Sequence, residues 1–150
     1  MRTVSLVVVA ILLALVSAAW ADNHVMMDPK ELKWEDNAAL PGAKVAVLEG
    51  PLDQPGPFII RFKFPANYKV PAHWHPNIEH VTVLSGTLYM GTGDKLDMAK
   101  GHPIATGGVA IMPAKTNHFG WTTEETVVQV HGVGPWGVTF VDPADDPRKK

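Results

Sequence analysis

The feature of this chain that most restricts its fold is the alternation of apolar and charged side chains over residues 58–64. Four apolar side chains fall on one face of an extended segment there, while Arg61 and Lys63 fall on the other. Similar short segments follow with glycine and proline between them, and no long 3.6-residue periodicity occurs after residue 21. We therefore predict an all-β fold, a small antiparallel β-barrel or jelly-roll sandwich, with strands over 44–48, 58–64, 72–75, 79–84, 87–90, 109–112, 118–122, 126–130 and 138–141.

Three connecting segments carry predictions of their own. Ser85 and Gly86 are typical of a tight hairpin turn between the strands on either side. The glycine-rich stretch 91–108 is expected to be mostly loop, with at most one short strand. The C-terminal segment 142–150 is polar and interrupted by proline, so we expect it to be loosely held.

The first residues differ in kind from the rest of the chain. Arg2 precedes an apolar stretch over residues 4–16, and small residues then lead to Ala19-Trp20-Ala21. This pattern predicts a secretory signal peptide over residues 1–21, cleaved after Ala21. A permanent anchor is disfavoured because a spanning helix needs about 20 apolar residues. We expect a single domain over residues 22–150, located in the periplasm or outside the cell, with no membrane contact after cleavage.

Composition limits the chemistry that the chain can perform. It has 150 residues and a net charge of -2, so it lacks the basic excess needed to bind nucleic acid. It contains no cysteine, which excludes disulfides and thiolate ligands. Any metal must therefore be bound by histidine nitrogen and carboxylate oxygen.

A group of histidines with one glutamate fits that requirement. His73 and His75 would point to the same face of a strand, roughly 6 to 7 Å apart. Glu79 shares a face with the apolar residues that follow it, whereas the alternation turns His80 to the opposite face. His118 follows a second apolar strand and turn. Such a set suits one divalent transition metal, whether Fe, Mn, Ni, Cu or Zn.

The spacing of these residues resembles the two motifs of the cupin superfamily. The first motif is represented by His73, His75 and Glu79 followed by a glycine at 86, and the second by a glycine at 107, Pro113 and His118. The resemblance implies a small β-barrel of two packed antiparallel sheets, with the three histidines and the glutamate as metal ligands near its centre. It also implies that a homodimer can form through edge strands.

The chain departs from the family pattern at three supporting positions. Asn67 and Lys115 stand where the motifs usually carry glycine, and Thr122 replaces a late asparagine. Asn67 tolerates positive φ and is expected to serve the same turn. The four candidate ligands are unaffected.

Other residues allow more than one interpretation. The candidate ligands could form a metal-free buried polar network. His131 could be a hydrogen-bonding or acid-base group beside the site, or a solvent-exposed residue at a strand end, and His102 is expected in an exposed loop. Seven aromatic residues could line a ligand pocket or fill the core: Phe62, Phe64, Trp74, Tyr89, Phe119, Trp121 and Trp136.

These observations lead to two main functional hypotheses. The first is an exported cupin that binds one divalent metal and acts as an oxygenase, lyase or isomerase on a small organic molecule, with Glu79 or His131 available for proton transfer. The alternative is a non-catalytic periplasmic module that binds or senses a metal or small ligand. A third, weaker hypothesis is a stress-protective surface protein without a site.

Overall fold

The structure, a computed structural model, describes residues 24–149. The predicted signal peptide at residues 1–21 lies outside the described residues. Within the part of the chain that is described, no helix is both long and apolar enough to span a membrane.

The described chain is built from β-strands and a few single turns of 3-10 helix. The 3-10 turns are η1 (Pro29–Glu31), η2 (Met98–Lys100), η3 (Pro143–Asp145) and η4 (Pro147–Lys149). The strands are β1 (Glu35–Asp36), β2 (Lys44–Glu49), β3 (Gly56–Phe64), β4 (Lys69–Trp74), β5 (Glu79–Ser85), β6 (Thr87–Thr92), β7 (His102–Ala105), β8 (Val109–Met112), β9 (His118–Thr122), β10 (Thr126–Gly134) and β11 (Thr139–Phe140).

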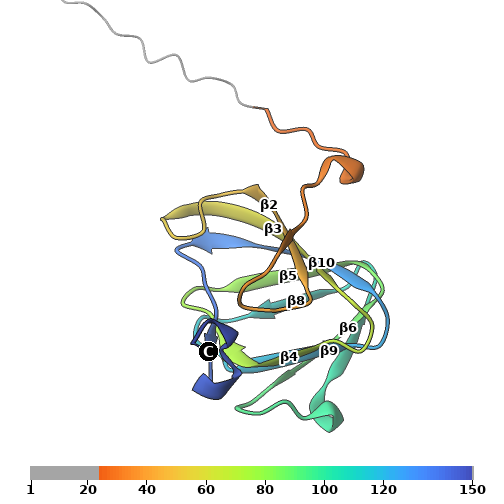
Figure 1. Cartoon of the computed structure of the whole chain (residues 1–150), viewed down its shortest axis with the longest axis vertical. Helices are drawn as coiled ribbons and strands as arrows, with labels where there is room; N and C mark the ends of the chain where they lie inside the picture. The colour runs from red at the N-terminus through yellow and green to blue at the C-terminus, as the bar shows by residue number, and fades with distance from the viewer. Residues whose placement is uncertain (1–23, 150) are drawn as a thin grey trace, which may run out of the picture.

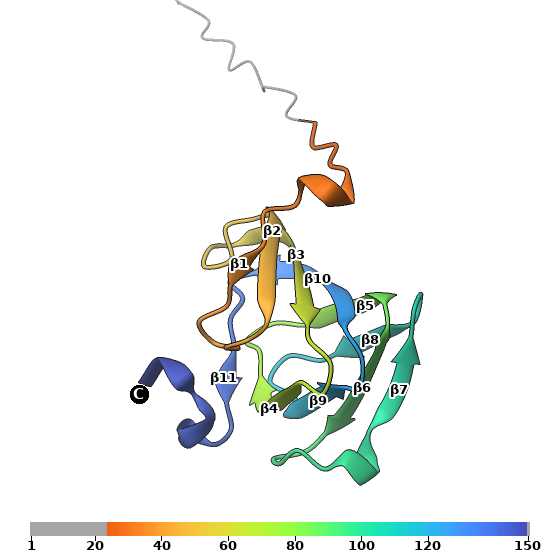
Figure 2. The same cartoon turned by 45° about the vertical axis from the view of Figure 1, so that its right-hand side comes forward.

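The strands form two antiparallel sheets that lie one above the other in Figure 1. One sheet has the strand order β1-β2-β3-β10-β5-β8, and the other has the order β11-β4-β9-β6-β7. Figure 2 shows β7 beside β6 at one side of the second sheet and β11 beside β4 at the other. The predicted all-β sandwich of antiparallel strands is confirmed.

The core fills the space between the two sheets. It takes its apolar side chains from β3, β10 and β5 on one side and from β4 and β6 on the other. The alternation that predicted β3 is visible in its burial, since Phe58, Ile60, Phe62 and Phe64 are buried and the residues between them are partly exposed. Burying one such side chain stabilises the fold by about 1.5 to 3 kcal/mol.

The hairpin predicted at Ser85 and Gly86 is wrong. β5 pairs with β10 and β8, whereas β6 pairs with β9 and β7, so the chain passes from one sheet to the other at this point. Gly86 has φ +76°, and a Cβ atom there would lie 2.6 Å from the carbonyl oxygen of Glu125. Glycine is therefore required by the corner between the sheets.

Two turn residues that depart from the family pattern adopt the conformation that glycine normally supplies. Asn67 and Lys115 both have φ of 60°. The prediction for Asn67 is therefore confirmed. Lys115 takes the same conformation, and its backbone N–H donates to the carbonyl of His75 over 2.8 Å, which ties this turn to the end of β4.

Two segments had a weak sequence pattern. One of them, 91–108, is as ordered as expected, and the other, the C-terminal segment, is more ordered. The stretch 91–108 contains the four-residue strand β7, in agreement with the expectation of at most one short strand. The expectation of a loose C-terminal segment is wrong for residues up to 149. Asp146 is buried there, and its Oδ1 accepts a 2.7 Å hydrogen bond from Nε of Arg148.

Candidate metal centre

The four predicted ligands lie together between the sheets. His73 is in β4, His75 directly follows β4, Glu79 begins β5 and His118 begins β9. His73 and His118 face each other as register partners across β4 and β9. All four are buried, with exposed fractions of 7% for His73, 4% for His75, 6% for Glu79 and 1% for His118. The structure therefore unites residues from two sheets at one point.

Each histidine ring is oriented by a backbone carbonyl. Nδ1 of His73 donates to the carbonyl of Pro71 over 2.7 Å, and Nδ1 of His118 donates to that of Thr116 over 2.8 Å. Nδ1 of His75 donates to the carbonyl of Gly137 over 2.8 Å. Because a carbonyl oxygen can only accept, each Nδ1 carries a proton, and each neutral ring has its free lone pair on Nε2. This is the arrangement by which proteins orient imidazole toward a metal.

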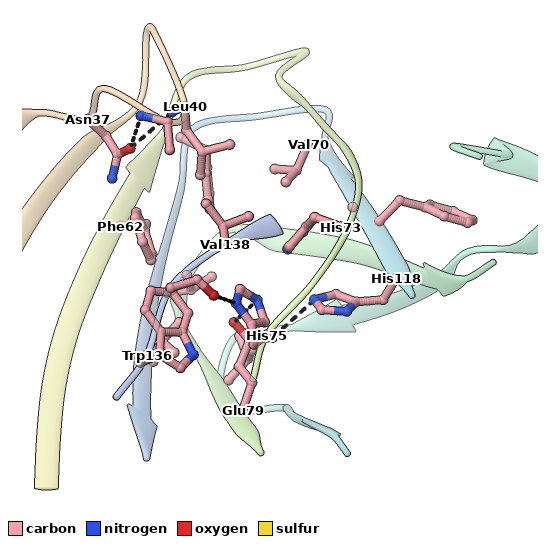
Figure 3. Close-up of a pocket in the computed structure, with 18 of the residues that line it drawn as sticks. Asn37, Leu40, Phe62, Val70, His73, His75, Glu79, His118, Trp136 and Val138 are labelled. Carbon is pink, nitrogen blue, oxygen red and sulfur yellow. Dashed lines mark hydrogen bonds and ion pairs between the residues drawn. The ribbon is translucent and has the colours of Figure 1, made fainter. Parts of the chain in front are cut away.

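The three histidine rings and the Glu79 carboxylate converge on one point, as Figure 3 shows. Each of the three histidines offers one ring nitrogen, and these nitrogens lie within 4.8 Å of one another. Oε1 of Glu79 lies 3.4 Å from Nε2 of His75, and its Oε2 lies 3.2 Å from Nε2 of His118. Among the described residues, Nε2 of His75 and Oε2 of Glu79 are buried without a hydrogen-bond partner. Buried lone pairs without donors fit a bound cation, and this nitrogen and oxygen set fits a divalent transition metal.

The electrostatics favour the unprotonated state that a metal requires at His73, His75 and Glu79, whereas at His118 they favour a proton that a metal would have to displace. Burial, followed by the neighbouring rings of His118 and His75, lowers the pKa of His73 to about 3. Burial also lowers the pKa of His75. Burial disfavours the charged form of Glu79, but contact with His118 and the other histidines outweighs it and lowers the pKa of this carboxyl. The carboxylate in turn outweighs burial at His118 and raises the pKa of that ring.

A cavity of about 200 Å³ adjoins the cluster. Its walls are mostly apolar and come from both sheets, including Phe62, Val81, Leu88 and Val130. Below the roughly 300 to 1,000 Å³ of drug-sized pockets, this volume suits a small molecule. The cavity and the four candidate ligands therefore form one site.

Some residues that line this site were not singled out by the sequence, and Trp136 was named only as one of seven aromatic candidates. Asn37 and Arg148 line the cavity although they are distant from both histidine motifs. Trp136 lies parallel to His75, with ring centroids 4.5 Å apart and 16° between the planes. It had no local signal beyond being aromatic, because its position depends on the segment 135–138 returning to the end of β4.

The aromatic residues divide between the cavity and the packing. Phe62, Phe64, Phe119 and Trp136 line the cavity. Tyr89 stacks on Trp121 with ring centroids 5.1 Å apart, away from the cavity lining.

The remaining histidines lie outside the site. His80 and His131 are register partners across β5 and β10, and their rings stack at 4.9 Å. Neither lines the cavity, as the alternation predicts for His80. The suggestion that His131 acts beside the site is wrong, because it is exposed and points away from the buried face of β10. His102 is exposed as expected, although it begins strand β7 rather than lying in a loop.

Comparison with known proteins identifies the fold. No family model and no curated protein matches the sequence. Among solved structures, the chain is similar to the polyketide cyclase RemF from Streptomyces resistomycificus, with 16% identity, a TM-score of 0.65, and 84% of this chain and 91% of that chain covered. An RmlC-like cupin protein from Ralstonia eutropha JMP134 has 21% identity and a TM-score of 0.62, with 83% and 76% covered.

A third similar structure is a sugar phosphate isomerase of the cupin superfamily from Silicibacter pomeroyi DSS-3. It has 20% identity and a TM-score of 0.59, with 77% of this chain and 81% of that chain covered. The chain therefore has the cupin fold, as its two motifs predict.

Proposed function

We propose that this chain is an exported metal-dependent enzyme with the cupin fold, which binds one divalent transition metal through His73, His75, Glu79 and His118. Its substrate is a small organic molecule held in the adjoining cavity. The observation that carries this proposal is the convergence of three Nε2 atoms, each freed for coordination by a carbonyl at Nδ1, beside a buried carboxylate. The similarity to a cyclase and an isomerase supports a catalytic role.

The residues of the site have separable roles in this proposal. A metal bound there would supply Lewis acidity and, for a redox-active ion, electron transfer. The three histidines hold the ion and their backbone carbonyls fix the ring orientations. Glu79 offsets the charge of the ion and, as the only carboxylate among the described residues that line the cavity, is the group available to accept a substrate proton. The apolar walls exclude water from the reacting groups.

The first test is metal binding. The protein, produced from the full chain without a chelating tag, is analysed for metal content, and the metal-free form is titrated with Mn, Fe, Ni, Cu and Zn. We expect one ion per chain, and at least about 100-fold weaker binding in His73→Ala and Glu79→Gln. His102→Ala is the matched control and should bind normally, because His102 is exposed and distant from the cavity lining.

The second test separates catalysis from binding. The metal-loaded protein is screened for oxygen consumption and substrate loss against small diketones, phenolics and organic acids. Activity that disappears in Glu79→Gln supports an enzyme. Tight, metal-dependent ligand binding without turnover would instead support the non-catalytic periplasmic binding or sensor module. Failure to bind any of the five metals would contradict both.

Export and assembly complete the proposal. Cleavage after Ala21 would place a mature chain over residues 22–150 in the periplasm or outside the cell, and N-terminal sequencing of the exported protein tests it.

A homodimer is supported by β8, a strand at the edge of its sheet. Val109 and Ile111 on this strand are 65% and 54% exposed, and pairing would cover such an edge. Light scattering of the purified protein tests the dimer.

A further inference from the structure

One polar group beside the cavity has no role in the proposed metal site. Nε1 of Trp136 is buried and has no hydrogen-bond partner among the described residues. The residue itself is only half-buried, and it lines the cavity. A buried N–H without an acceptor is destabilising, and native structures usually supply a partner from protein, water or ligand.

The indole is held firmly next to a candidate ligand. Its ring stacks on His75, and the ring of Phe58 lies tilted against it with the centroids 5.3 Å apart. The backbone N–H of Trp136 donates to the carbonyl of Leu52 over 2.6 Å, and the next residue, Gly137, accepts from Nδ1 of His75. Figure 3 shows the Trp136 indole beside His75, with Glu79 close by in the same view. The segment 135–138 therefore fixes both a candidate ligand and an unpaired donor beside it.

The other polar side chains of the cavity lining outside the metal site, Arg148 and Asn37, make hydrogen bonds within the protein, and neither contributes a buried donor without a partner. Arg148 donates from Nε and Nη2 to Asp146 and from Nη2 to the carbonyl of Val138. The side-chain oxygen of Asn37 accepts from the backbone N–H groups of Ala39 and Leu40. Trp136 therefore offers the buried donor that a ligand oxygen could use beside the metal centre.

We propose that Trp136 is a substrate-binding residue that donates a hydrogen bond from Nε1 to an oxygen of the substrate. This inference rests on the proposed metal centre and specifies its substrate class. The substrate is a small compound with an apolar body of a few carbons and a carbonyl or carboxylate oxygen. The apolar body of the substrate is inferred from the cavity, which has a volume of about 200 Å³ and mostly apolar walls. The substrate oxygen is inferred from the indole donor, and it must lie within reach of both Trp136 and the histidine cluster.

The indole N–H gives a direct readout of this hydrogen bond. The zinc-loaded full chain, labelled with ¹⁵N, is titrated with isobutyrate and separately with pentane-2,4-dione. The Trp136 resonance is assigned by its loss in Trp136→Phe. We expect its proton to move downfield on saturation with at least one probe, and the probe that does so distinguishes a carboxylate from a diketone. The indole resonances of the other tryptophans should not move in the same way.

Affinity provides the second readout. Phenylalanine keeps an aromatic face against His75 but lacks the donor, so Trp136→Phe should bind the probe about tenfold more weakly while its zinc affinity stays within about twofold. Trp34→Phe is the matched control, because Trp34 packs under Lys63 outside the cavity lining and should leave both affinities unchanged.

The outcomes separate this inference from the proposed function. If zinc binds but both probes bind wild type and Trp136→Phe equally, with no shift of the indole proton, the role of Trp136 is overturned and the metal centre stands. If zinc binds and neither probe binds, the substrate class is overturned. If none of the five divalent metals binds, the proposed function fails and this inference fails with it.

Discussion

At the scale of single residues, His73 shows how burial and neighbouring charge define the site. It is buried beside two other imidazoles, and its pKa is lowered to about 3. An unfolded chain would protonate the same ring near its ordinary pKa of about 6.5. Between these values the unfolded state binds more protons than the folded state, so the free energy of unfolding falls as pH falls.

We predict that the metal-free protein loses about 2 kcal/mol of unfolding free energy through His73 between pH 7.5 and pH 5. His75, whose pKa is also lowered, acts in the same direction. His118 has a raised pKa, so its contribution is complete below about pH 6.5 and is lost only as pH rises. Urea unfolding at the two pH values measures the change. His73→Gln should have a shallower pH dependence, and an unchanged dependence would contradict the role assigned to burial.

At the scale of elements, strands were predictable where the alternation of apolar and polar residues is strong. They were less predictable where pairing with a neighbouring strand determines their existence or their ends. β3 and β5 lie where their patterns indicate. β10 was expected to end at residue 130, but it continues to Gly134 because it pairs with β3 over its whole length. β1, two residues long, was not predicted and is a strand because it pairs with β2. β11 lies within the predicted segment 138–141, but only Thr139 and Phe140 pair with β4.

In the candidate site too, local sequence patterns predict some features, whereas others depend on contacts between distant segments. The spacing of His73, His75 and Glu79 placed them together, because alternation and motif order are local properties. The β4–β9 register shifts between Val70 and His73, and no pattern within β4 indicates this irregularity. The carbonyl that orients His75 belongs to Gly137, far away in sequence. Contacts of this kind depend on how the sheets close.

Thr122 is the residue through which the turn before β4 is joined to β9. Its Oγ1 accepts from the backbone N–H of Tyr68 over 3.2 Å and donates to the carbonyl of Pro65 over 2.7 Å. Threonine thus supports the turn around Asn67 from the position where the family pattern has asparagine.

We predict that Thr122→Val destabilises the protein by about 1 to 3 kcal/mol, because valine keeps the shape but leaves both backbone groups without this partner. Thr122→Ser retains the hydroxyl and should lose clearly less. Thermal or urea unfolding of the three metal-free proteins checks the order. Equal stability of the valine variant and the wild type would show that water replaces the hydroxyl at no cost.

At the scale of the whole molecule, the candidate ligands join the two sheets. His73 and His118 belong to the five-stranded sheet, whereas Glu79 begins β5 in the six-stranded sheet. A metal held by all of them would link the sheets through the middle of the core, in a chain that has no disulfide to do so. The unfolded chain has no preformed site, so the binding free energy would add to the free energy of unfolding.

We therefore predict that a divalent metal at 100 times its dissociation constant raises the free energy of unfolding by about 2.7 kcal/mol, and that a chelator reverses the gain. At the same metal concentration Glu79→Gln should gain much less, because it removes the one charged ligand and the one contributed by the six-stranded sheet. His131→Ala, which alters the outer face of that sheet, should gain as much stability as wild type.

Hydrogen exchange then tests whether the metal links the two sheets. If the metal slows exchange in β4 and β9 but leaves β5 and β10 unchanged, the ion is bound by the histidines of one sheet alone, and Glu79 is a neighbour of the metal rather than a ligand.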